Sequence, residues 1–205
     1  YRLLTAYYVA VGEHDKALAE IASVYEEHPK DLAVKKGYIA LLLTKNKVAE
    51  ATKLNDEILE ANAKDVDALI TRGRLLNRSG NPKEAVQALE NALKQEPDNG
   101  AAHFYLGLAL GQIGDAGRAE TELRAAAQHS PNMIEVHEAL AAVATRKGDV
   151  NLLLESAEHL IKLEPFSARG TPTPLRRPCP PGHAWPIARR GGRARSSARR
   201  CRRRA

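Results

Sequence analysis

Residues 66–99 read VDALITRGRLLNRSGNPKEAVQALENALKQEPDN, and residues 100–133 read GAAHFYLGLALGQIGDAGRAETELRAAAQHSPNM. The two stretches are equally long, and glycine, leucine, alanine and proline recur at matched positions 34 residues apart. A period of this length is typical of α-solenoids built from helix–turn–helix units. The pair of stretches therefore predicts an all-α repeat protein.

The same period extends across most of the chain. One series consists of prolines, with alanine in the gap: Pro29, Ala63, Pro97, Pro131 and Pro165. A second series consists of glycines, with asparagine in the gap: Gly12, Asn46, Gly80, Gly114 and Gly148. These series predict a repeat array over residues 1–165, with copies at about 1–31, 32–65, 66–99, 100–133 and 134–167. The second copy lacks both its glycine and its proline, so we expect it to be the least regular.

Each copy reads as two amphipathic helices separated by a short turn. In the third copy the apolar spacing predicts a helix over about 66–79 and a second over about 82–95. Gly80 suits the turn, Asn81 and Pro82 suit the start of the second helix, and Pro97 ends it. Applied to all copies, the pattern predicts ten helices and no strand. Asp31, Asp65 and Asn99 precede first helices and are predicted to cap them.

The residues of the fourth copy resemble the tetratricopeptide repeat family. The matching residues are Leu106, Gly107, Leu110, Gly114, Ala119, Leu123, Ala126 and Pro131. The resemblance, which is to bacterial-type members, implies a right-handed α-solenoid, or superhelix, of five units whose first helices line the concave side. It also implies a non-catalytic scaffold that binds a peptide or protein segment in that concave groove. His103 and His137 stand where the family often has tryptophan, and we expect them to fill that packing position.

The charge divides the chain into two unlike parts. Residues 1–165 carry 19 Lys and Arg against 25 Asp and Glu, whereas residues 166–205 carry 12 Arg and no acidic residue. We expect residues 168–205 to form a disordered, Arg- and Pro-rich basic tail. The tail has two interpretations: an arginine-rich arm that neutralises nucleic-acid phosphates, or an out-of-frame translation. The second is favoured because Lys disappears from this segment together with the acids.

No motif for catalysis, a cofactor or a metal is present, so we expect neither an enzyme nor a small-molecule substrate. Both cysteines, Cys179 and Cys201, lie outside the repeats. No apolar run is long enough to predict a membrane span. The chain starts at Tyr1 within a repeat, which favours a piece of a longer protein. Its localisation, cytoplasmic or bacterial periplasmic, stays open.

Two binding devices known in relatives of this family are absent from the matching positions. The two-carboxylate clamp would need basic or amide residues at Ala40, Thr71, Ala101 and Tyr105, and only Lys36 fits. An asparagine ladder would need asparagine at Gly37, Thr71, Tyr105 and Ala139. A different groove chemistry is therefore expected.

The inward positions of the first helices predict a polar and basic groove. The candidate residues are Arg74, Asn77, Arg78, Phe104, Leu108, Gln112 and Arg146. Arg78, Gln112 and Arg146 follow each other at the repeat spacing, and Phe104 would supply an aromatic anchor. The expected partner is an acidic or carboxylate-bearing protein segment. Two alternatives remain: a nucleic-acid-associated protein that uses the tail, and a repeat region of a larger bacterial lipoprotein linked to export or exopolysaccharide assembly.

Overall fold

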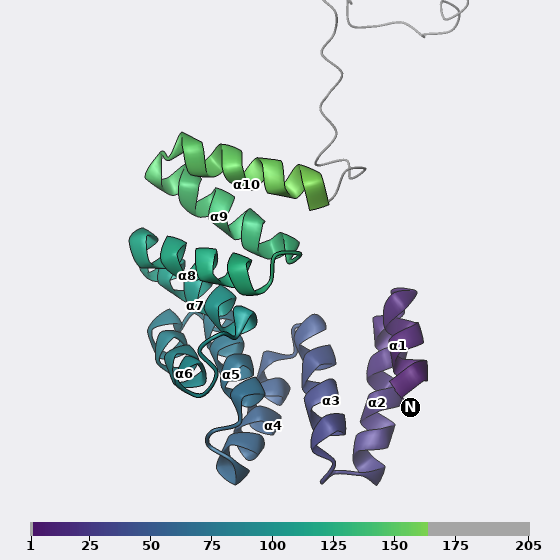
Figure 1. Ribbon diagram of the computed structural model, residues 1–205. Coiled ribbons are helices and arrows are strands. Elements are labelled where there is room, and N and C mark those ends of the chain that lie inside the picture. Colours follow the sequence, from purple (N-terminus) through teal and green to yellow (C-terminus); the bar gives the residue numbers. More distant parts are fainter. Residues whose placement is uncertain (1, 164–205) are drawn as a thin grey trace, which may run out of the picture. The chain divides into compact units, whose positions relative to one another are not determined.

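The computed structural model describes residues 2–163, and this part of the chain consists of helices joined by short turns, without a strand (Figure 1). The predictions for residues 168–205 fall outside it. The ten helices are α1 (Arg2–Ala10), α2 (His14–Glu27), α3 (Leu32–Thr44), α4 (Val48–Ala61), α5 (Val66–Arg78), α6 (Pro82–Gln95), α7 (Gly100–Ile113), α8 (Ala116–His129), α9 (Ile134–Lys147) and α10 (Val150–Leu163). The predicted helices at about 66–79 and 82–95 are confirmed as α5 and α6.

The turn inside each pair has a left-handed residue at the predicted position. Gly114 has a φ of 96°, and its counterpart Asn46 in the second copy has a φ of 58°. A Cβ added to Gly114 would meet no atom within 4 Å, so the backbone angle, and not a lack of space, favours glycine here. Asparagine tolerates this conformation better than most residues. The second copy therefore keeps the turn although it lacks the glycine.

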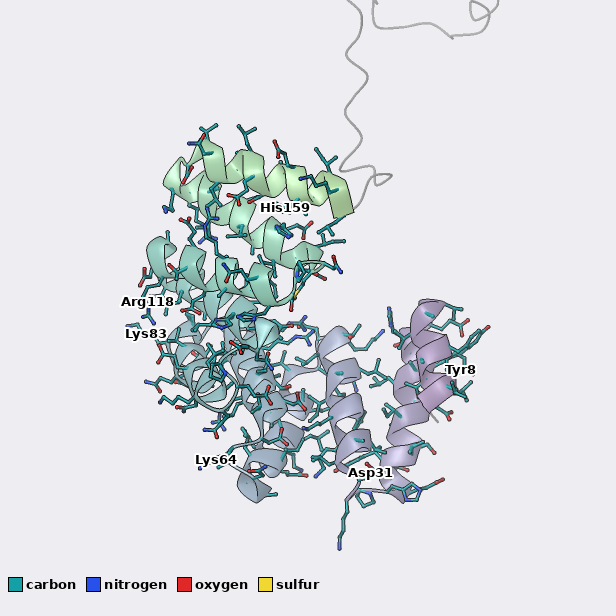
Figure 2. The ribbon with its side chains drawn as sticks, viewed as in Figure 1. Tyr8, Asp31, Lys64, Lys83, Arg118 and His159 are labelled. Carbon is teal, nitrogen blue, oxygen red and sulfur yellow. The ribbon has the colours of Figure 1, made fainter. Side chains whose placement is uncertain are left out.

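Side chains before the first helices cap them as predicted. The Asp31 carboxylate accepts hydrogen bonds from the backbone N–H groups of Ala33 and Val34, at 2.8 and 3.2 Å. Asp31 lies at the turn that precedes α3 (Figure 2). Asp65 and Asn99 cap α5 and α7 in the same way. Asn81 stands at the N-cap of α6, as expected, but its side chain makes no capping hydrogen bond.

Glycines in the first helices set how closely the two helices of a pair approach. A Cβ added to Gly107 on α7 would lie 2.6 Å from Cγ of Leu123 on α8. Gly73 faces Leu89 in the same way in the preceding pair, at 2.4 Å. Real Cβ contacts are essentially never this short, so only glycine permits this helix separation. The packing explains why glycine occurs in the middle of both helices despite its conformational cost.

Each pair also packs against the next, as a solenoid requires. The largest apolar cluster runs through the third, fourth and fifth copies. Of two smaller clusters, one lies in the first two copies and the other extends from the second copy to Ala68 and Leu75 of the third. The second copy has Ile39 and Asn55 where the third has Gly73 and Leu89. Asn55 is 1% exposed; its Nδ2 donates to the Ala68 carbonyl at 3.1 Å, and its Oδ1 has no partner. A buried amide thus replaces a core leucine in this copy.

A network of ion pairs links the last three helices. Arg124 on α8 donates through Nε to Glu120 Oε1 at 3.0 Å and lies 3.4 Å from Glu155 on α10. Lys147, at the end of α9, donates to the other carboxylate oxygen of Glu120. The hydrogen bonds from Lys147 and then Arg124 hold the pKa of Glu120 below its usual value. Glu120 therefore connects two adjacent copies as an anion.

We expect Gly107→Ala to lower the free energy of unfolding by about 1 to 3 kcal/mol, because the methyl group would force α7 and α8 apart. Urea unfolding monitored by circular dichroism measures this change. Gly111 on the same helix is the matched control: a Cβ there would meet only Arg146 Nη1, at 3.7 Å. Gly111→Ala should raise stability by up to about 1 kcal/mol through helix propensity. Equal effects of the two substitutions would contradict the packing argument.

Glu120→Gln should lower stability by about 1 kcal/mol at pH 7. The folded-state pKa of Glu120 is lowered from its ordinary value of 4.5, so the stabilisation is complete above that value. It is lost as the pH falls through the folded-state pKa. The two proteins should therefore become equally stable at strongly acidic pH. Chemical unfolding across this pH range tests the prediction, and a constant difference would refute it.

Candidate functional site

The surface formed by α1, α3, α5, α7 and α9 is called here the first-helix face. Most of the predicted groove residues lie on it. Arg74 of α5 stands over the Tyr105 ring of α7, with Cζ 5.7 Å from the ring centre, a cation–π distance. Asn77 donates through Nδ2 to the Tyr105 carbonyl at 3.1 Å. Its Oδ1 is buried without a partner. Arg74 and Asn77 thus also join two neighbouring first helices.

Arg78 and Arg146 make equivalent contacts two copies apart. Arg146 donates through Nη1 to the Gly111 carbonyl, in the last turn of α7, at 2.7 Å. Arg78 donates through Nη1 to the Leu43 carbonyl, in the last turn of α3. Such carbonyls lack partners within their helix, and the helix dipole favours a cation beside them. Each arginine therefore anchors its copy to the preceding one while its other N–H groups stay exposed.

The remaining predicted residues fall into two environments. Gln112 occupies the position of Arg78 and Arg146 in the intervening copy, and it is exposed. Leu108 is half-buried and packs against the main apolar cluster. Phe104 is only 6% exposed and belongs to that cluster. The structure therefore does not present Phe104 as an aromatic anchor, because its ring is used in the core.

The arginines differ in their acidic partners according to where they lie. Arg72, Arg118 and Arg124 each form an ion pair with a carboxylate. Arg74, Arg78 and Arg146 form none with any described residue. The three arginines of the predicted groove thus lack the carboxylate partners that Arg72, Arg118 and Arg124 have in the part of the chain that the structure describes.

Lys36, unlike the three groove arginines, forms ion pairs with carboxylates. Its Nζ lies 2.9 Å from Asp65 and 2.8 Å from Asp67, at the start of α5. Burial lowers the pKa of Lys36, but the hydrogen bonds to these two carboxylates outweigh it and raise the pKa above its ordinary value. Lys36, the one residue that matches the two-carboxylate clamp, therefore links α3 to the start of α5.

A groove between α1 and α3 was not predicted from the sequence. It has a volume of about 530 Å³, and its lining is almost entirely apolar: Ala6 and Val9 come from α1, Ile21 from α2, and Gly37 and Leu41 from α3. A Cβ on Gly37 would lie 2.9 Å from Ile21 Cδ1. The glycine therefore keeps the base of this groove open. We call it the α1–α3 groove.

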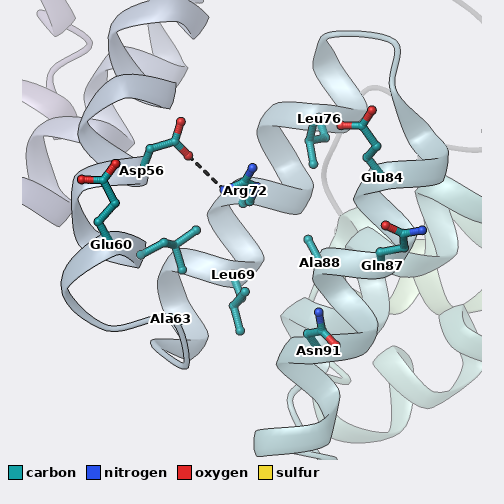
Figure 3. Close-up of a pocket in the computed structure, with 11 residues that line it drawn as sticks. Asp56, Glu60, Ala63, Leu69, Arg72, Leu76, Glu84, Gln87, Ala88 and Asn91 are labelled. Carbon is teal, nitrogen blue, oxygen red and sulfur yellow. Dashed lines mark hydrogen bonds and ion pairs between the residues drawn. The ribbon is translucent and has the colours of Figure 1, made fainter.

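A second groove lies between α4 and α6, across α5, and is called the α4–α6 groove (Figure 3). Its volume is about 720 Å³. Leu69 and Leu76 of α5 lie between Asp56 and Glu60 of α4 on one side and the polar residues of α6 on the other. Arg72 reaches from α5 to Asp56, with Nη1 3.1 Å from Oδ1.

The α6 wall of this groove carries Glu84, Gln87 and Asn91. The groove therefore combines an apolar floor with carboxylates at its rim. The sequence signal that could have revealed it is Leu69, which stands where the second copy has a lysine and the fourth and fifth have a histidine.

Four of the histidines form two stacked pairs, each between a first helix and a second helix. His103 of α7 stacks on His129 of α8 with ring centres 5.7 Å apart, and His137 of α9 stacks on His159 of α10 at 4.7 Å. The prediction that His103 and His137 fill a packing position agrees with these contacts.

Within residues 2–163, no three His, Cys, Asp or Glu side chains gather as a metal site would need. None of the described helices is long and apolar enough to cross a membrane.

Two family models match the chain, and both are described as tetratricopeptide repeat. One matches residues 8–73 and the other residues 70–134. Together they cover residues 8–134 without a gap.

Two curated relatives are named "Probable UDP-N-acetylglucosamine--peptide N-acetylglucosaminyltransferase SPINDLY". The protein of Hordeum vulgare is 29% identical over 111 residues, and that of Solanum lycopersicum is 26% identical over 108 residues. These matches cover 54% and 53% of this chain but only 12% of either relative. The chain therefore corresponds to a small part of each transferase, and the likeness lies in the repeats.

Solved structures share the fold at low sequence identity. TTC0263, a thermophilic tetratricopeptide protein of Thermus thermophilus, has a TM-score of 0.72 and 19% identity, covering 80% of this chain and 90% of its own. MamA of Desulfovibrio magneticus RS-1 has a TM-score of 0.61 and 21% identity, covering 80% and 93%. YrrB, described as having an unusual peptide-binding site, has a TM-score of 0.56 and 20% identity, covering 81% and 86%. The expected all-α tetratricopeptide superhelix is confirmed.

Arg146→Ala should lower stability by about 1 kcal/mol, because the Gly111 carbonyl would lose its charged donor. Gln112→Ala is the matched control, since it removes an exposed polar side chain one copy away at the equivalent position. That substitution should change stability by less than about 0.5 kcal/mol. Thermal and urea unfolding measure both. An unaffected Arg146→Ala protein would show that the contact between copies carries no energy.

Proposed function

Because the chain belongs to the tetratricopeptide repeat family, whose arrays are scaffolds for protein–protein interaction, we propose that its first-helix face binds an acidic segment of a partner protein. The observation that carries the proposal is the set of arginines without a counter-charge. Arg74, Arg78 and Arg146 lie on this face, and no described carboxylate pairs with them. The described repeats would otherwise favour pairing, since acidic residues outnumber basic ones in residues 1–165.

The geometry of these arginines suits a carboxylate ligand. Arg74 and Arg78 are one helical turn apart on α5, so their side chains are neighbours. Each guanidinium has five N–H donors, and Arg78 uses a single bond to a carbonyl. The remaining donors are held in place by that bond, which reduces the entropy lost when a ligand binds.

The α1–α3 groove adds a complementary apolar element on the same face. Its lining of Val9, Ile21 and Leu41 would accept an aliphatic side chain. A partner segment with both carboxylates and aliphatic residues therefore matches this face better than a purely acidic one. Binding in the groove is recognition without a chemical step, and the preformed helices avoid an ordering cost on the protein side.

We expect Arg74→Glu to weaken binding of a short fluorescent peptide of alternating Glu and Leu by about tenfold or more, since it reverses a charge beside the ligand. Fluorescence anisotropy measures the Kd. Arg118→Glu is the matched control: it makes the same charge change on the exposed surface of α8, away from the first-helix face (Figure 2). Both proteins retain residues 166–205, so any attraction from that segment is the same in each. Equal loss of affinity in both variants would refute the proposed face.

A further inference from the structure

One position of the repeat decides whether the space between successive second helices is filled. It is occupied by Lys35, Leu69, His103 and His137 in the second to fifth copies. Lys35 is held by Glu57, with Nζ 2.8 Å from Oε2, and lies over the Tyr25 ring. The side chain of Lys35 is only 16% exposed. In this copy a lysine from the first helix and a glutamate from the second fill the space.

The two histidines do the same in the last two copies. His103 contacts Glu122 Oε2 through Nδ1 at 2.7 Å and the Pro97 carbonyl through Nε2 at 2.8 Å. His137 stacks on His159 and leaves a smaller cavity of about 230 Å³. Each residue that lines this cavity is equivalent to a residue that lines the α4–α6 groove two copies earlier. His137, for example, is equivalent to Leu69. The four spaces are therefore equivalent sites with different occupants.

The third copy has no polar side chain at this position. Leu69 is 8% exposed and stays in the floor of the groove. The residue equivalent to Glu57 is Asn91, which lies in the α6 wall (Figure 3). The basic group that occupies this space in the second copy is thus absent, and about 720 Å³ stays open.

The rim of the groove carries unused negative charge. Arg72 neutralises Asp56 at 3.1 Å. Glu60 and Glu84 line the groove from its two walls, and neither forms an ion pair with a described residue. Carboxylates beside an apolar floor suit a lysine or arginine, whose methylene stem packs on apolar surface while its charge reaches the rim.

We propose that the α4–α6 groove is a second docking site, which binds a basic segment of a partner protein. A lysine or arginine of that segment occupies the space that Lys35 fills in the preceding copy, with its stem on Leu69 and Leu76 and its charge at Glu60 and Glu84. This site lies between second helices and has the opposite charge to the first-helix face. One repeat array therefore holds two segments of different chemistry.

The test uses the full chain and a short fluorescent peptide of alternating Lys and Leu, with anisotropy as the measurement. Glu60→Gln combined with Glu84→Gln should weaken binding by about tenfold or more, because both rim charges are removed. Glu27→Gln combined with Glu158→Gln is the matched control, since it changes the net charge equally at exposed positions outside the groove. The control should bind within about twofold of the wild type.

A second variant closes the groove without changing the net charge. Leu69→Lys combined with Asn91→Glu copies the Lys35–Glu57 pair into the third copy, and circular dichroism would verify that it folds. It should lose binding of the Lys/Leu peptide but keep that of the Glu/Leu peptide. The proposal is overturned if the rim variant and its control lose affinity equally. It is also overturned if the Glu/Leu peptide competes for the groove, or if sedimentation shows that a second copy of the chain occupies it.

Discussion

The contact between a first-helix glycine and a second-helix leucine determines how each central pair is built. Where Gly107 meets Leu123, and Gly73 meets Leu89, the two helices approach until no side chain fits between them. The leucine then packs in the core of its own pair, and the other apolar residues of the pair are directed to the neighbouring copies. Stability is consequently shared between copies, as expected for a solenoid. Leu89 and Leu123, the leucines of these two contacts, both belong to the large apolar cluster.

The second copy shows what happens when that contact changes. Ile39 replaces the glycine and Asn55 replaces the leucine, so a buried amide with an unsatisfied oxygen lies where the core should be. The copy keeps its turn through Asn46, and it contacts its neighbours through Lys35, which lies over the Tyr25 ring, and Lys36, which pairs with Asp67. Ion pairs and hydrogen bonds thus support a region where apolar packing is weaker.

The two faces of the array differ in chemistry because their side chains have different neighbours. On the first-helix face, arginines reach the ends of adjacent helices and bind carbonyl oxygens, which leaves their charge uncompensated. Between second helices, ion pairs join Arg118 to Glu90 and Arg124 to Glu155. In the α4–α6 groove, Leu69 and Asn91 stand where the preceding copy has the Lys35–Glu57 pair, and Glu60 and Glu84 form no ion pair with a described residue. The open groove thus coincides with the loss of both members of the pair that occupies the equivalent space in the second copy.

The sequence alone determined the repeat, the helices and the turns, because backbone demands are local: a left-handed turn favours glycine or asparagine, and a cap needs a short polar side chain such as Asp31. It also placed Arg74 and Arg78 on the first-helix face, because helical spacing fixes the direction of a side chain. Only the tertiary structure decided that Phe104 is buried, that Arg146 binds a carbonyl, and that the α4–α6 groove is open. Those properties depend on residues from neighbouring helices, such as Leu69 and Asn91, whose distances arise from packing and not from the order of the chain.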